Sequence, residues 1–319
     1  MTTYAETPHE EVMGPRYDMS PEELQQSAEL FLHDNPPREG SGRFVCYRIE
    51  NDSPYADIGR TIEGNVFMES FGNDAETMTR AYGPYEQASS FFVNFDMQSN
   101  KPVGVLRIIK NSEAGLMTLN DLESGERMRD VKTDQPVKIS AESVMQFHSD
   151  PKQGKLFESL DECWDIGTVA VVPEYRASKS GQLLTSVQLY RAAYLSAMAA
   201  GIKHFTSVVD TAPLRQMTNF LGIPFRALAN TPPVHYLDSP KSQAVYGYVP
   251  DFYEKMSKHR QTGRGRVARQ LLDPLMDGAG GMDDSLQCFT PQELVALRQL
   301  TQTGVRRRGH GLLSLLIKR

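Results

Sequence analysis

The sequence predicts an α/β protein in which a sheet of mixed strand direction lies between layers of helices. Apolar segments within 89–109 and within 225–249 form two pairs joined by turns, which predicts antiparallel strands. The nearly continuous apolar run 164–172 predicts a strand buried on both faces. A helical pattern and a further strand at 204–209 follow it, so this part of the chain is typical of a β-α-β unit.

The other elements follow from local patterns. Ser20-Pro21 with two glutamates is typical of a helix start, and Asn35-Pro36-Pro37 ends that helix. Residues 111–160 are expected to be a long polar insertion of loops and short helices. Gly201 is expected to close the helix of the β-α-β unit. The remaining predictions are a strand at 43–49 and helical segments at 55–80, 214–221, 251–261, 266–276 and 291–303.

The charge distribution divides the 319 residues into three parts. We predict a helical leader over 1–40, a core over 41–250 and a basic helical extension over 251–319. Lys255–Arg319 carries a net charge of +7, although the whole chain carries −6. A basic tail on an acidic body suits an anionic partner, such as a phosphorylated cofactor, an acidic carrier protein, nucleic acid or a membrane surface. A solvated helical extension explains the same charges equally well.

Several classes of protein are not expected. No run of 18 apolar residues occurs, so we predict no membrane span, and the polar N-terminus lacks the features of a secretory signal. Cys46, Cys163 and Cys288 are widely spaced, which argues against a disulfide framework or a thiolate zinc site and favours the cytoplasm. The histidines show no paired spacing, so no metal site is predicted.

The loop after the buried strand carries the strongest chemical signal. A strand ends near Val172, and a helix begins near Leu183. A helix N-terminus offers unpaired N–H groups to a phosphate, and Arg176 and Lys179 add positive charge there. Gly181 permits close approach of a ligand to the backbone. A charged connection with a capping glycine is the alternative interpretation.

The same loop resembles the signature of the GCN5-related N-acyltransferase superfamily in Val172-Pro173-Glu174-Tyr175-Arg176 and Gly181-Gln182-Leu183-Leu184. The resemblance implies a mixed, mostly antiparallel sheet flanked by helices over about 43–250. It also implies an acyl-CoA, or the phosphopantetheine of an acyl-carrier protein, as co-substrate. Lys179 stands where the family usually has its first glycine. The implied contacts to this co-substrate are Val169, Val171, Arg176, Lys179, Ser180, Gly181 and Gln182.

A narrower resemblance links the chain to acyl-homoserine-lactone synthases and long-chain N-acyl amino acid synthases. It rests on the stretches 60–69 (RTIEGNVFME), 85–86 (YE), 103–107 (VGVLR) and 164–168 (WDIGT). It implies transfer of an acyl group to a small amine, such as an amino acid. Asp165 and Thr168 replace the glutamate and arginine of those families, so amide formation is expected rather than lactone formation.

Such a transfer needs a base for the amine and donors for the oxyanion. Asp165 is the leading candidate for the base, because apolar surroundings would raise its pKa, and Glu86 is the second. Arg107 and Thr168 are candidates for binding substrate, with Arg107 holding a carboxylate. The tyrosine that many family members use as an acid would fall at Thr218, so Thr218 or Asn219 is left to contact the thiolate. Each of these side chains is also compatible with a purely structural role.

Two functions therefore stay open on the sequence. The first is an N-acyltransferase for a small amine, with a medium or long acyl chain favoured over acetyl, and with coenzyme A or an acyl-carrier protein as the carrier. The apolar residues Phe67, Met68, Phe71 and Met78 would then line an acyl tunnel, or else simply pack a helix on the sheet. The second is a catalytically silent module of the same fold that binds an acyl-carrier protein or another anionic partner. Nucleic acid is not expected as a partner of the transferase.

Overall fold

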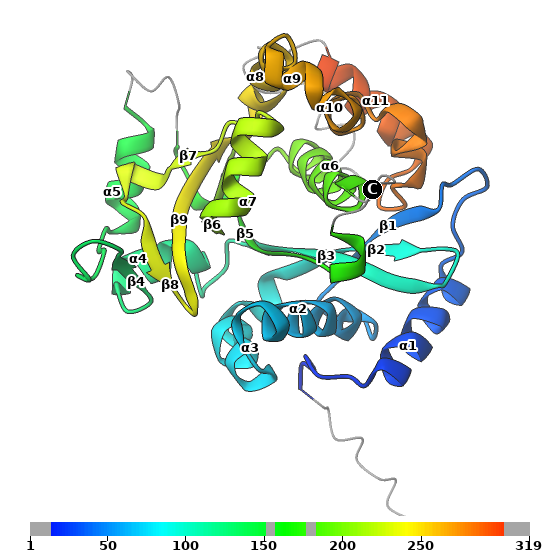
Figure 1. The fold of residues 1–319 in the computed structure, drawn as a ribbon, viewed down its shortest axis with the longest axis horizontal. Coiled ribbons are helices and arrows are strands. Elements are labelled where there is room, and N and C mark those ends of the chain that lie inside the picture. The colour runs from blue at the N-terminus through cyan, green and yellow to red at the C-terminus, as the bar shows by residue number, and fades with distance from the viewer. Residues whose placement is uncertain (1–13, 151–156, 177–182, 303–319) are drawn as a thin grey trace, which may run out of the picture.

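The computed structural model describes residues 14–150, 157–176 and 183–302. Their strands form one nine-stranded sheet in the order β1-β2-β3-β5-β6-β9-β8-β4, with β7 paired to β9 (Figure 1). The pairing of β5 with β6 is parallel, and the other pairings are antiparallel. The strands are β1 Phe44–Glu50, β2 Ser89–Asp96, β3 Lys101–Lys110, β4 Met128–Asp130, β5 Cys163–Val171, β6 His204–Asp210, β7 Arg226–Ala227, β8 Val234–Tyr236 and β9 Ser239–Tyr248.

Helices cover both faces of this sheet, as Figure 1 shows for α6 on one side and α2 and α3 on the other. The predicted α/β class with a mixed, mostly antiparallel sheet between helical layers is therefore confirmed. The α-helices are α1 Pro21–Asp34, α2 Ala56–Phe71, α3 Ala75–Tyr82, α4 Met117–Ser124, α5 Ala141–His148, α6 Leu183–Ala199, α7 Thr211–Arg215, α8 Phe252–Arg260, α9 Gly263–Val267, α10 Arg269–Asp277 and α11 Pro291–Gln302.

Alternation along the strands divides the core between the two faces. Val93 and Phe95 of β2 pack with α1 and α2, whereas Phe92 packs with α6 and the C-terminal helices. Successive side chains of a strand point to opposite faces, so a strand buried on both sides loses the alternating polar pattern. All eight residues of β2 are buried for this reason.

The helical segment expected over 55–80 is two helices rather than one. Gly72 ends α2 in the left-handed region, with φ of 78°. Asp74 then begins α3, and its side chain accepts a hydrogen bond from the backbone N–H of Thr77. Glycine adopts this conformation without steric cost, so it commonly closes a helix. The two helices can consequently take different directions over the sheet.

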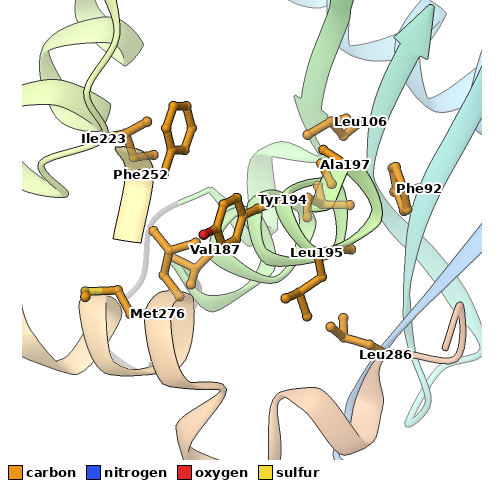
Figure 2. Packing of buried hydrophobic residues seen from close by; sticks show 14 of the residues in the cluster. Phe92, Leu106, Val187, Tyr194, Leu195, Ala197, Ile223, Phe252, Met276 and Leu286 are labelled. Carbon is orange, nitrogen blue, oxygen red and sulfur yellow. The ribbon is translucent and has the colours of Figure 1, made fainter. Parts of the chain in front are cut away.

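The polar insertion and the C-terminal extension both join the folded body. Within the insertion, β4 pairs with β8 at the edge of the sheet. Residues of α8, α10 and α11 belong to the same buried cluster as α6, and Figure 2 shows Phe252 and Met276 beside Tyr194 of that helix. Among the described residues, no helix is both long and apolar enough to cross a membrane.

Candidate functional site

The parallel pair at the centre of the sheet separates soon after it begins. β5 pairs with β6 only over Cys163–Asp165, opposite His204–Thr206. Farther on, β6 stays paired with β9, and β5 stays paired with β3. The segment Ile166–Val171 therefore has no strand partner on the side that faces β6. Ser207 marks the point of separation, where its hydroxyl donates to the carbonyl of Ile166 over 2.7 Å.

A cavity of about 400 Å³ fills this opening and reaches both faces of the sheet. Thr168 and Val169 of β5 and Ser207 and Asp210 of β6 line its centre. The other elements that contribute to its wall include α2, α3, β3, α6, α7, β8, β9 and the C-terminal helices. Their lining residues include Val66, Phe67, Phe71, Tyr82, Tyr190, Tyr194, Met217, Tyr236, Asp238, Ser242, Phe252, Tyr253, Met256, Leu275 and Met276.

Two backbone N–H groups of β5 face the opening. The N–H of Val172 donates to the carbonyl of Val103 in β3 over 3.0 Å. Backbone groups of a strand alternate between its two sides, so the N–H groups of Val169 and Val171 point the other way, toward β6. The hydrogen bond of the Val171 carbonyl supports this direction, because its donor is Nε of Arg176, at 2.6 Å, and not a backbone group of β3. Val169 and Val171 therefore both present an N–H group to the opening, and their contact with a co-substrate stays a prediction.

Arg176 also lines the cavity and is exposed at its mouth. Its Nη2 lies 3.9 Å from a carboxylate oxygen of Glu69 in α2, a weak contact that leaves the guanidinium available to a ligand. The other predicted contacts of this loop, Lys179, Ser180, Gly181 and Gln182, lie outside the described residues.

Beside the cavity lies a buried network of charged side chains. Arg107 is completely buried and binds Glu63 of α2 through Nε and Nη2, the latter over 2.8 Å. It also binds Glu86 through Nη1 over 3.1 Å, and the hydroxyl of Tyr17 through Nη2 over 2.6 Å. Thr168 connects this network to the cavity, because it lines the cavity and its hydroxyl donates to Glu63.

Glu63 and Glu86 experience different electrostatic environments. Burial raises the pKa of Glu63 despite the opposing positive charge of Arg107. Burial would also raise the pKa of Glu86, but the charges of Arg107 and Arg60 outweigh it and hold that pKa below its usual range. The charged form is therefore favoured at Glu86, whereas the carboxylate of Glu63 binds a proton more readily than that of an ordinary glutamate.

Two sequence predictions do not agree with this placement. Neither Arg107 nor Glu86 lines the cavity, and their polar atoms bind Glu63, Arg60, Tyr17 and each other. Arg107 was expected to hold a substrate carboxylate and Glu86 to act as a second base. The structure places both in an internal ion-pair network instead, in which Arg107 is paired with Glu63 and Glu86, and Glu86 with Arg60.

Asp165 likewise lies away from the cavity wall. Its carboxylate accepts hydrogen bonds from the backbone N–H and hydroxyl of Thr118, over 2.5 and 2.8 Å, at the start of α4. Burial raises its pKa to about 7, as the sequence led us to expect. However, Asp165 lies in the part of β5 that is still paired with β6, so it does not reach the opening directly.

The raised pKa of Asp165 makes stability depend on pH. A carboxyl that is harder to ionise in the folded state contributes stability below its unfolded pKa and loses that contribution as pH rises toward 7. Between pH 4 and pH 8, the free energy of unfolding should therefore fall by about 4 kcal/mol, which corresponds to a shift of about three pKa units. In Asp165→Asn, the side-chain oxygen accepts from the Thr118 N–H and the amide donates to the hydroxyl. Urea unfolding at several pH values should therefore show that the free energy of unfolding falls less with rising pH in the variant than in the wild type. Parallel curves would contradict the assignment.

The sequence analysis missed several residues of the cavity. Asp210 accepts hydrogen bonds from the hydroxyls of Ser239 and Ser242 of β9, and Asp238 lines the same region. Asp210 follows the predicted strand 204–209 directly, so its place at a strand end was a usable signal. Asn219 lies instead in a separate surface hollow with His259 and Arg264. The Thr218 hydroxyl donates to the Leu214 carbonyl within its own helix.

Within the part of the chain that the structure describes, no group of three His, Cys, Asp or Glu side chains is arranged to hold a metal ion.

Comparison with known proteins gives structural likeness only. No protein-family model and no curated protein sequence matches the chain. Among solved structures, the CoA-dependent acyl-homoserine lactone synthase BjaI with SAM and isopentyl-CoA is similar over 80% of this chain and 99% of its own, at 15% identity and a TM-score of 0.45. FeeM, an N-acyl amino acid synthase from uncultured soil microbes, matches over 67% and 94%, at 14% identity and a TM-score of 0.42. The AHL synthase LasI matches over 66% and 91%, at 13% identity and a TM-score of 0.41.

Proposed function

We propose that the protein is an N-acyltransferase that moves an acyl group from a phosphopantetheine thioester to a small amine. The observation that carries this proposal is the separation of β5 from β6, which leaves the N–H of Val169 facing a cavity beside the hydroxyl of Thr168. A fixed backbone donor next to a side chain that can move a proton is what acyl transfer to an amine requires.

The donor thioester would lie along β5. Its carbonyl oxygen would accept a hydrogen bond from the Val169 N–H, which strengthens as the oxygen becomes an oxyanion. Arg176, at the mouth of the cavity, would bind a phosphate of the carrier. The apolar residues Phe67, Phe71 and Met217 line the same cavity and suit a hydrocarbon chain. Acyl-CoA and an acyl-carrier protein both present this phosphopantetheine group.

The proton would leave the amine through Thr168 and Glu63. As the amine nitrogen forms its bond to the thioester carbon, its proton passes to Oγ1 of Thr168, and the hydroxyl proton of Thr168 passes to Glu63. When the tetrahedral intermediate collapses, the C–S bond breaks and the thiolate leaves with the electron pair. A thiol has a pKa near 8.5, so the departing sulfur needs little assistance from an acid. The raised pKa of Glu63 favours its role as the acceptor.

The amine would approach from the side of β8 and β9. Asp210 and Asp238 line the cavity there, and carboxylates attract an ammonium group, which would lose its first proton to water before the neutral amine attacks. Because Arg107 is committed to Glu63 and Glu86, a carboxylate on the substrate would need a partner other than Arg107.

Free-thiol release tests this function. The purified full-length chain is mixed with acetyl-, octanoyl- or palmitoyl-CoA, or with an octanoyl carrier protein, in the presence and absence of pooled amino acids. We expect thiol release that depends on the amine, and mass spectrometry should detect the N-acyl product. If the protein binds a thioester but releases no thiol with any donor and amine, the result would contradict a transferase and favour the catalytically silent binding module.

A further inference from the structure

The C-terminal helices form one wall of the cavity. Tyr253 of α8 and Leu275 and Met276 of α10 line it directly, opposite α6. This wall is anchored from α6 itself, because the buried guanidinium of Arg191 binds the carbonyls of Leu275 and Met276 over 3.2 and 2.6 Å. Residues remote in sequence from the β5–β6 opening thus determine the shape of the ligand space.

Tyr194 lies on α6 against this wall. Its ring stacks on Phe252 with centroids 5.9 Å apart and an interplanar angle of 8°, and the residue is 8% exposed (Figure 2). Tyr194 lines the cavity, and its hydroxyl has no hydrogen-bond partner among the residues that the structure describes. A buried tyrosine hydroxyl normally finds a partner, so this one is suited to a ligand.

We infer that the hydroxyl of Tyr194 donates a hydrogen bond to an oxygen on the chain of the bound ligand and thereby selects among acyl donors. This inference rests on the proposed function. The oxygen has two sources in such a donor: an amide carbonyl of the pantetheine arm, or a substituent on the acyl chain close to the thioester. Either oxygen would accept a hydrogen bond from the Tyr194 hydroxyl, which a plain hydrocarbon chain would leave without a partner.

Tyr253 provides a matched control on the same wall. Its hydroxyl donates to Asp277 over 3.1 Å, so it already has a partner within the protein. Tyr253→Phe removes a hydroxyl of the same kind from the same cavity without removing a donor that is available to the ligand. Any change in affinity that it causes should therefore be the same for ligands with and without the additional oxygen.

The experiment is calorimetric binding to the full-length wild type, Tyr194→Phe and Tyr253→Phe, without an amine. The ligands are S-octanoyl-pantetheine, S-butyl thiooctanoate and S-butyl 3-hydroxythiooctanoate. Tyr194→Phe should lose about 3- to 10-fold in affinity for one oxygen-bearing ligand and nothing for S-butyl thiooctanoate. Loss on the pantetheine ester identifies the amide as the partner, and loss on the hydroxy ester identifies the acyl substituent.

Equal affinities of wild type and Tyr194→Phe for all three ligands would overturn the inference, and so would an equal loss on all three. If the wild type binds none of the three ligands, both the inference about Tyr194 and the proposed class of acyl donor would be overturned. Binding with the expected loss but no acyl transfer to any amine would overturn the proposed function and leave the role of Tyr194 intact.

Discussion

Replacing Thr168 by valine should lower the rate of acyl transfer by about 100-fold, since positioned proton transfer contributes roughly that factor or more. Valine matches the shape of threonine but lacks the hydroxyl that connects the cavity to Glu63. The affinity for the donor should be nearly unchanged, because the backbone N–H of Val169 remains in place. Steady-state rates and donor affinity, measured on the same preparation, separate these two effects.

Thr61→Val is the matched control for this experiment. Thr61 is fully buried on α2, two residues before Glu63, and its hydroxyl oxygen has no hydrogen-bond partner within the described segments. The variant should transfer acyl groups at the wild-type rate. The pH profile adds a second readout, because a base with a raised pKa is active only above that pKa. The acid limb of the wild-type rate should therefore lie above the range of an ordinary glutamate. Full activity in Thr168→Val would exclude the Thr168–Glu63 route.

Arg191→Met should destabilise the protein by about 3–5 kcal/mol, the usual cost of breaking a buried ion pair by removing one partner, because Asp283 then keeps only the partly exposed Arg298. Arg191 and Asp283 are both completely buried and form two hydrogen bonds of 3.1 and 3.2 Å. The substitution also frees the carbonyls of Leu275 and Met276 at the end of α10. Chemical unfolding followed by circular dichroism measures the loss.

Arg298 provides the comparison for Arg191. It binds the same Asp283 over 2.6 Å, but its side chain is about one-third exposed. Water compensates for the loss of an exposed partner, so Arg298→Met should cost only about 1 kcal/mol. Similar losses in the two variants would show that the buried arginine does not anchor the C-terminal helices as the contacts suggest.

Local patterns were sufficient to predict most of the elements. The strands at β2, β3 and β5 and the helix α6 arise from apolar periodicity and turn residues, which act over a few positions of the chain. The helix expected over 55–80 was wrong at Gly72, because a glycine in the sequence is compatible with either a helix interior or a helix end, and only the structure shows the left-handed conformation that ends α2.

The site depended on longer distances. Glu63, Glu86, Arg107 and Thr168 come from four separate segments, and only the folded sheet brings them together. The sequence analysis identified three of them but not Glu63, because a glutamate on an expected helix gives no local sign that it is buried. The predicted partner of Arg107 was a substrate carboxylate, whereas the structure pairs Arg107 with Glu63 and Glu86. An arginine in an apolar strand can bind either a ligand or an internal acid, so the sequence does not distinguish the two.

By itself, the sequence determined the order of strands and helices, the mixed α/β class and the importance of β5, because these follow from the pattern of residues along the chain. Only the tertiary structure decided which side chains reach the cavity. Gly167 is unpaired in the register of β5 with β3, so Asp165 and Thr168 face the same side despite their odd spacing. Asp165 is sealed where β6 pairs with β5, and Thr168 opens to the cavity where the two strands have separated. A bulge and a strand separation are properties of neighbouring strands, and for this reason the sequence of one strand does not contain them.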